Sequence, residues 1–268
     1  MSAGDTARDL GQDVSVEGPD GGSALFDLLL LMAWRWAAEL EESLGMPALA
    51  QFDRGRERQL RETAQTLYWD SGRRLYADTS RKQEFSQHAN TLAVLAGLIG
   101  GAEGRDLLLR ALADDKLAKP SLFFRFYLHQ ALSAVGDGDT YLDRLGDWRD
   151  MVAKGLTTFA EIVDRPGNAS RSDCHAWSAS PNIEILRTVL GVDSAAPGFR
   201  KVAVRPHLGK LAFVSGSVPH PKGDIEVRVE RQGSGFSAAV SLPPDTTGTF
   251  EFAGIQRDLQ PGANHIEG

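Results

Sequence analysis

The spacing of apolar residues along the chain changes once, near Pro197. Before that point, apolar residues recur every three or four positions, which is the period of one face of an α-helix. Gly and Pro mark breaks between these stretches, and Ser23 and Pro181 stand where a helix favours a capping residue and a first-turn proline. The pattern predicts helices from Ser23 to Gly45, Asp53 to Trp69, Phe85 to Leu98, Asp106 to Leu112, Pro120 to Gly136, Tyr141 to Val152 and Pro181 to Gly191. Such a succession indicates αα-hairpins, as in an α/α toroid, rather than alternating strands and helices.

After Pro197 the period becomes two, which is typical of β-strands. The predicted strands cover residues 201–205, 213–218, 224–230, 236–242 and 249–252, with Gly and Pro between them. They predict a small antiparallel β-sandwich of roughly 70 residues, near the low end for independent stability. Within the helical part, we expect residues 70–78 to form a turn between two short extended pieces.

These patterns divide the chain into three parts. Residues 1–22 hold Gly, Asp and Ser without periodicity, and we expect them to form a flexible leader. Residues 23–196 are predicted to form a helical domain, and residues 197–268 the β-sandwich domain. The composition, with 42% apolar and 24% charged residues, is that of a globular protein.

Charge and cysteine content narrow the class of protein. The net charge of −7 argues against a nucleic-acid partner, because affinity for nucleic acids rests on neutralising phosphates. Cys174 is the single cysteine, which excludes an intramolecular disulfide and a thiolate metal cage, and we expect neither a metal nor a cofactor. The sequence begins without a secretory signal and holds no apolar run long enough for a membrane span, so we expect a soluble cytoplasmic protein.

The candidate chemistry gathers in residues 155–181, GLTTFAEIVDRPGNASRSDCHAWSASP. Glu161 precedes a polar loop, and Asp173, His175 and Trp177 follow within five positions. Polar side chains on a loop need water or a ligand, whereas His and Trp favour enclosure. This combination suits a sugar, because an indole contacts the apolar face of the ring while carboxylates and imidazole bind hydroxyls. The alternative is a helix–loop–helix connection in which the His and Trp are structural.

Four runs carry a resemblance to a known family. TTFAE, SDCHAWSASP, APGFRKVAVRPHLG and GSVPHPKGDIEVRVE follow one another between Gly155 and Glu230. In this order they resemble the C-terminal half of the α-L-rhamnosidases, family 78 of the glycoside hydrolases. Looser similarity extends back to Gly21, where GGSALFDLLLLMAWRWAAELEESLG resembles a barrel helix of that family. The resemblance implies part of a six-hairpin α/α barrel followed by a β-sandwich.

The resemblance also implies a reaction and a substrate. Members of this family hydrolyse terminal α-L-rhamnosides with inversion, and the glutamate of their TT-x-x-E run, here Glu161, activates water as the general base. Their general acid lies in the N-terminal half of the barrel, and we find no run in this chain that matches its motif. The alternative role for Glu161 is that of a helix-end cap.

One further position on the loop, His175, follows from the resemblance, and the chemistry of its neighbours suggests roles for them. The family histidine that corresponds to His175 lies in the substrate pocket, so we expect His175 to contact sugar hydroxyls. Trp177 would either stack on the sugar ring or wall the pocket. Asp173 would either orient His175 or cap the turn. We expect Cys174 to be buried and inert.

A second cluster lies at the start of a predicted helix. Gln87 and His88, with Asn90, stand where a barrel helix would meet the pocket, so Gln87 and His88 are candidates for substrate contact. The alternative is that these residues are solvated or cap the helix.

Other functions stay open at this point. The chain could be a catalytically silent carbohydrate-binding remnant, a subunit completed by a second chain, or a six-hairpin glycosidase acting on another sugar. Because half a toroid leaves an apolar face uncovered, we also expect self-association or a second chain over that face.

Overall fold

The computed structural model of the protein describes residues 22–163 and 171–268, so nearly all of the predicted leader lies outside the described residues. The described residues form two compact units. The first holds residues 22–135 together with 161–163 and 171–172, and the second holds residues 136–160 and 173–268. The predicted domain boundaries at residues 22 and 196 stay predictions.

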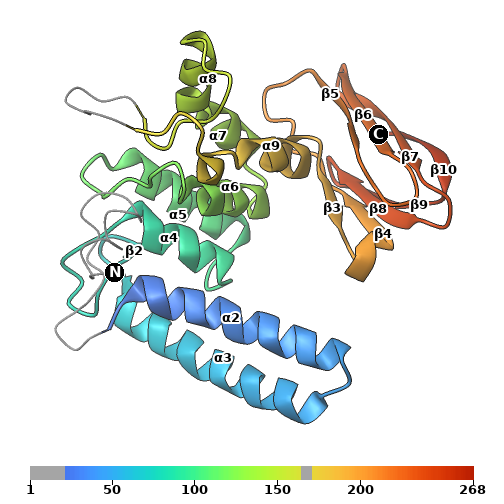
Figure 1. The fold of residues 1–268 in the computed structure, drawn as a ribbon. Coiled ribbons are helices and arrows are strands. Elements are labelled where there is room, and N and C mark those ends of the chain that lie inside the picture. The colour runs from blue at the N-terminus through green and yellow to red at the C-terminus, as the bar shows by residue number, and fades with distance from the viewer. Residues whose placement is uncertain (1–21, 164–170) are drawn as a thin grey trace. The chain divides into compact units, whose positions relative to one another are not determined.

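Two long helices begin the first unit. α2 (Ala24–Ser43) and α3 (Pro47–Tyr68) lie side by side (Figure 1). Ser23 takes the expected N-cap position, although its hydroxyl makes no capping bond. Pro47 opens α3 instead of closing the helix before it, because a first-turn proline lacks only an N–H that the helix does not use. The second helix therefore begins earlier than the predicted Asp53.

A short hairpin follows α3, as the sequence predicts. β1 (Trp69–Asp70) and β2 (Leu75–Tyr76) pair antiparallel. The side chain of the fully buried Asn90 binds this hairpin: its Oδ1 accepts from the N–H of Tyr76 at 2.9 Å, and its Nδ2 donates to the Tyr76 carbonyl at 3.1 Å. The hairpin is thereby fixed to the helix that carries Asn90.

Three shorter helices complete the first unit: α4 (Gln87–Leu95), α5 (Gly101–Ala113) and α6 (Arg125–Ala134). α4 contacts α2, α5 and α6, and its residues from Gln87 to Val94 are all buried. Ser86 caps α4 by accepting a hydrogen bond from the N–H of Ala89 at 3.2 Å. α6 begins after the predicted Pro120, because residues 122–124 form a turn.

The second unit starts with short helical pieces: α7 (Gly138–Asp143), α8 (Gly146–Ala153), η1 (Ala176–Ser178), α9 (Pro181–Glu184) and η2 (Ile185–Val189). The predicted helix from Tyr141 to Val152 is thus two helices, and Gly146, a poor residue for a helix interior, begins the second. Pro181 stands in the first turn of α9, as expected. Gly191 follows η2 with φ +82°, and a Cβ there would lie 2.3 Å from the carbonyl carbon of Arg205.

Two four-stranded sheets make up the rest of the second unit. One has the order β10–β7–β6–β5 and the other β3–β4–β8–β9. Their bounds are β3 Val192–Ser194, β4 Lys201–Val204, β5 Phe213–Val218, β6 Ile225–Gln232, β7 Gly235–Leu242, β8 Thr247–Phe252, β9 Ile255–Leu259 and β10 Gly262–Glu267. Apolar residues of both sheets form one buried cluster, which includes Val202, Val227 and Phe250.

Strand pairing departs from the sequence prediction in one place. Neighbouring strands run antiparallel except for β4 and β8, which are parallel. After β4 the chain forms three strands of the other sheet, and it then enters β8 in the same direction as β4. The local sequence of a strand does not show which strand it will pair with or in which direction. The five predicted strands are present, whereas β3, β9 and β10 were not predicted.

Candidate functional site

In the second unit, backbone and side-chain bonds hold residues 173–178 in place. The N–H of His175 donates to the carbonyl of Phe159 at 2.8 Å, and the hydroxyl of Thr158 donates to the carbonyl of Asp173. The hydroxyl of the buried Ser178 donates to the carbonyl of Ala160 at 2.6 Å. These bonds give the polar loop a defined backbone on which its side chains are displayed.

The structure brings His175 and Trp177 together. Their ring centroids lie 4.2 Å apart with an angle of 49° between the planes, and both side chains are half-buried. The indole N–H of Trp148 in α8 donates to the carbonyl of Ser178 at 2.7 Å, which anchors the turn that carries Trp177. An imidazole beside an indole offers one polar edge and one flat apolar face, as a sugar ring requires.

Asp173 and Cys174 precede this pair on the same loop. Both residues are exposed. The expectation that Cys174 is buried is therefore wrong: Asp173 and Cys174 stand in a bend of the loop that leaves both side chains exposed. Whether the Asp173 carboxylate orients His175 or caps the turn stays a prediction.

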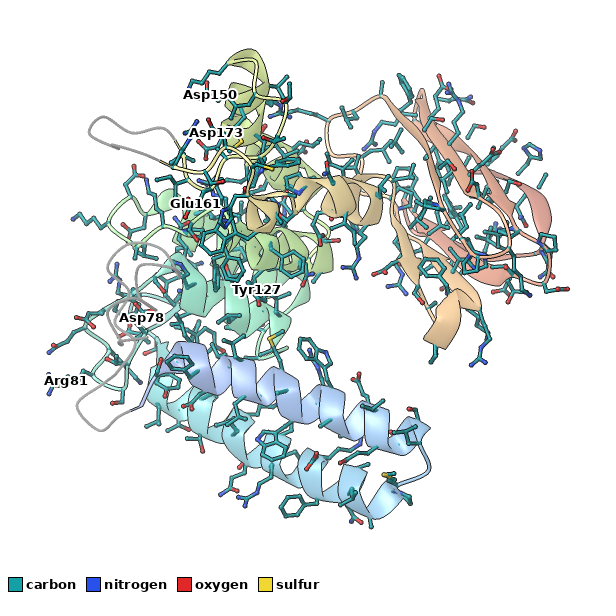
Figure 2. All side chains as sticks on the ribbon, in the orientation of Figure 1. Asp78, Arg81, Tyr127, Asp150, Glu161 and Asp173 are labelled. Carbon is teal, nitrogen blue, oxygen red and sulfur yellow. The ribbon has the colours of Figure 1, made fainter. Side chains whose placement is uncertain are left out.

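Glu161, which is labelled in Figure 2, belongs to the first unit, and it pairs with Ser172 there. The N–H of Glu161 donates to the Ser172 carbonyl at 2.8 Å, and carboxylate oxygen Oε2 accepts from the Ser172 N–H at 3.2 Å. The guanidinium of Arg171 donates to the carbonyl of Ile162 at 3.1 Å beside this pair. The Glu161 side chain is half-buried, so its carboxylate is oriented by the backbone and still meets solvent.

Gln87 and His88 lie deep within the first unit, with exposed fractions of 2% and 0%. The side-chain amide of Gln87 donates to the carbonyl of Ala111 at 3.3 Å, and the His88 ring lies 4.3 Å from that of Phe124. These contacts join α4 to its neighbours. Burial leaves little of either side chain to meet a ligand, and their contact with substrate stays a prediction.

Asp78 is a buried carboxyl group that the sequence analysis did not single out. It is 2% exposed, and its Oδ1 accepts from the hydroxyl of Ser86 at 2.6 Å. Burial raises the pKa of Asp78 to about 7, against the effect of the Ser86 bond, and the nearby Glu84 adds to the rise. The signal in the sequence was weak, because an aspartate after the apolar run of β2 also fits an ordinary turn.

Known proteins match this chain in its C-terminal strands and in its fold. Residues 191–266 match the family of the bacterial alpha-L-rhamnosidase C-terminal domain. The structure is similar to that of the GH78 family rhamnosidase of Bacillus sp. GL1, with 26% identity and a TM-score of 0.71 over 84% of this chain. Residues 191–266 thus resemble a rhamnosidase C-terminal domain, and the chain is similar in fold to part of a family 78 rhamnosidase. The resemblance seen in the sequence is thus confirmed, as is a helical region followed by mainly antiparallel sheets.

Two further rhamnosidases are similar to this chain, one in its fold and one in its sequence. The α-L-rhamnosidase from Streptomyces avermitilis, complexed with L-rhamnose, has the same fold over 95% of this chain, with a TM-score of 0.74 and 20% identity. A curated alpha-L-rhamnosidase from Alteromonas sp. (strain LOR) is 40% identical over 63 residues, which are 23% of this chain and 7% of that protein. The chain spans 25% of the Bacillus protein and 27% of the Streptomyces protein. Among the described residues, no helix is long and apolar enough to cross a bilayer.

Proposed function

We propose that this chain forms part of an inverting glycoside hydrolase that cleaves terminal α-L-rhamnosides. The matched C-terminal domain and the likeness to family 78 rhamnosidases support the class of enzyme. The rhamnosidases from Streptomyces avermitilis and Klebsiella oxytoca were crystallised with rhamnose. Rhamnose is therefore the first sugar to test on this chain.

The single observation that carries the proposal is the environment of Glu161. Hydrolysis with inversion needs a carboxylate that removes a proton from the attacking water. Glu161 has Oε2 held by the N–H of Ser172 at 3.2 Å and a side chain that still meets solvent. A carboxylate fixed by the backbone and accessible to water fits a general base better than a mobile surface glutamate does.

In the proposed reaction, the water oxygen attacks the anomeric carbon while Glu161 takes its proton. The bond from that carbon to the leaving oxygen breaks on the opposite face, and the leaving oxygen takes a proton from a carboxylic acid about 6.5–9.5 Å from the base. We assign the acid to a carboxyl outside the four matching runs, in another segment of the barrel or in a second chain.

His175 and Trp177 are proposed to bind the sugar. Their adjacent rings, 4.2 Å apart, offer the imidazole nitrogens to hydroxyls and the indole face to the C–H face of the ring. The exposed Asp173 is proposed to bind a further hydroxyl or to orient His175. Gln87 and His88 are proposed to hold α4 against its neighbours in the interior of the first unit.

A panel of aryl glycosides tests this function. Together with the N-terminal part of a family 78 barrel, which would supply the acid, the chain should cleave the α-L-rhamnoside in preference to the other sugars, and the chain alone is assayed beside it. NMR of the first product should show β-L-rhamnose, because inversion changes the anomeric configuration. Preference for another glycoside, or an α-anomer as first product, would contradict the proposal. Binding of rhamnose without turnover by either preparation would favour a silent binding protein.

A further inference from the structure

A hollow in the first unit lies outside the 155–181 loop. Its volume is about 710 Å³, within the range of small-molecule sites. It lies between the segment from Asp78 to Phe85 and residues 115–119 of the connection between α5 and α6. A bridge between Ser86 and Ala118, and a bond of 3.0 Å from the Gln87 N–H to the Ala118 carbonyl, join the two segments. We propose that this hollow is a second binding site, and that it takes a neutral saccharide.

Asp78 supplies the most enclosed polar group of the hollow. Its backbone is fixed on both sides: its N–H donates to the carbonyl of Glu84 at 2.9 Å, and its carbonyl accepts from the N–H of Ala24 at the start of α2, also at 2.9 Å. Its Oδ1 accepts from the Ser86 hydroxyl at 2.6 Å. The Asp78 side chain is 2% exposed, so it fixes the wall of the hollow, and the exposed Glu84 and Lys116 at the rim offer the polar contacts to a ligand.

Cationic groups lie on the same walls. The guanidinium of Arg73 is 4.2 Å from the ring centroid of Phe85 and pairs with Asp114 at 2.9 Å. The ammonium of Lys119 pairs with Asp115 at 2.7 Å. Lys116 forms no ion pair with a carboxylate in residues 22–163 or 171–268, so its ammonium can donate to a ligand.

The balance of these groups selects the class of ligand. An anion such as phosphate would meet the carboxylates of Glu84 and Asp115, and a cation would meet the ammonium and guanidinium groups. A sugar hydroxyl both donates and accepts, so adjacent hydroxyls can donate to a carboxylate and accept from Lys116. Phe85 and Leu117 form the apolar part of the wall but are 9% and 3% exposed, so the polar groups at the rim make most of the contact with a sugar. Only the choice of rhamnosides as the first sugars rests on the proposed function.

Titration of the full chain with methyl α-L-rhamnoside and with the rhamnosyl disaccharide rutinose, followed by chemical shifts of the ¹⁵N-labelled protein, tests the site. Both Lys116 and Glu84 are exposed at the rim, so Lys116→Met and Glu84→Gln should fold normally. Each should weaken binding about tenfold, the worth of one hydrogen bond to a charged group. Arg58→Met, an equivalent change on the exposed face of α3, should bind as the unaltered chain does.

The outcomes separate this site from the catalytic loop. Shifts near Asp78 and Lys116 that persist in Glu161→Gln and weaken in Lys116→Met support the second site, even if Glu161 proves not to be the base. The inference is overturned if neither sugar shifts resonances of residues 78–85 and 115–119 at millimolar concentration, or if Lys116→Met and Glu84→Gln both bind unchanged. It is also overturned if inorganic phosphate binds there and the sugars do not. The proposed function survives these failures when turnover still depends on Glu161.

Discussion

Asp78 holds its carboxyl group where burial disfavours the charged form. Its pKa of about 7 lies above the ordinary value of 3.8 that it regains on unfolding. Between these two values the folded chain keeps a proton that the unfolded chain releases. The contribution of Asp78 to stability is therefore present below pH 4 and is lost as the pH rises towards 7.

Asp78→Asn should remove this dependence, because an amide does not ionise. As the pH rises from 4 to 8, the variant should gain free energy of unfolding relative to the unaltered chain, by about 1.4 kcal/mol for each unit of pKa difference. Burial lowers the pKa of His129 to about 3, but His129 is present in both proteins, so its acid sensitivity cancels in the comparison. Urea titrations across this range measure the difference, and Asp106→Asn, exposed on α5, is the control. A difference that does not vary with pH would contradict the assignment.

Sequence motifs found some residues of the candidate site and missed others. Glu161, His175 and Trp177 were singled out because they stand in runs that resemble a family, and the structure pairs His175 with Trp177. The exposure of Cys174 was predicted wrongly, because residue type alone favours burial, whereas the bend at Asp173 and Cys174 leaves both side chains exposed. Asp78 was missed because its burial depends on Ser86 and on the start of α2, which local sequence does not reveal.

At the scale of elements, Asn90 joins the β1–β2 hairpin to α4. Asn90→Ala would leave both the N–H and the carbonyl of Tyr76 without these partners in a buried place. We expect a loss of roughly 2–3 kcal/mol in the free energy of unfolding, the usual cost of unsatisfied buried polar groups. Chemical denaturation measures it, with Gln51→Ala on the exposed face of α3 as the control. If Asn90→Ala proved as stable as the control, the hairpin would not depend on this side chain.

The elements themselves were predictable to different degrees. The spacing of apolar residues predicts α2, α4 and the strands β5 to β7, because in each of them apolar residues recur at the period of that element. The strands β9 and β10, with sequences IQRDL and GANHIE, alternate weakly, and their place in the sheets comes from their partners. The parallel pairing of β4 with β8 likewise depends on the whole topology, which no local pattern contains.

At the scale of the molecule, the α2–α3 pair exposes an unusual amount of apolar surface. The exposed side chains are Phe26, Leu30, Trp36, Leu40, Leu44, Met46, Leu49 and Phe52. Leu40 and Phe52 are 60% and 57% exposed, although large apolar side chains favour burial. This surface is where we expect the predicted self-association or second chain.

The chain should therefore bind a hydrophobic dye and sediment faster than a 29.0 kDa monomer. Leu40→Lys combined with Phe52→Lys should reduce both effects, because charges on this surface oppose its burial. Val152→Lys removes a single exposed apolar side chain in α8 and should change neither. Analytical ultracentrifugation measures the association, and dye fluorescence measures the exposed apolar surface. A chain that sediments as a monomer and does not bind the dye would show that this surface does not require a partner.

The role of Glu161 is tested most directly by Glu161→Gln in the chain completed by the rest of the barrel. Gln retains the size of the side chain and an acceptor for the Ser172 N–H, but it cannot take a proton from water. We predict that kcat on an aryl α-L-rhamnoside falls about 10²–10⁴-fold, with sugar binding and the melting temperature nearly unchanged. Glu62→Gln, on the exposed face of α3, should leave all three unchanged. Unaltered turnover with a lowered melting temperature would instead identify Glu161 as a structural residue and contradict its role as the base.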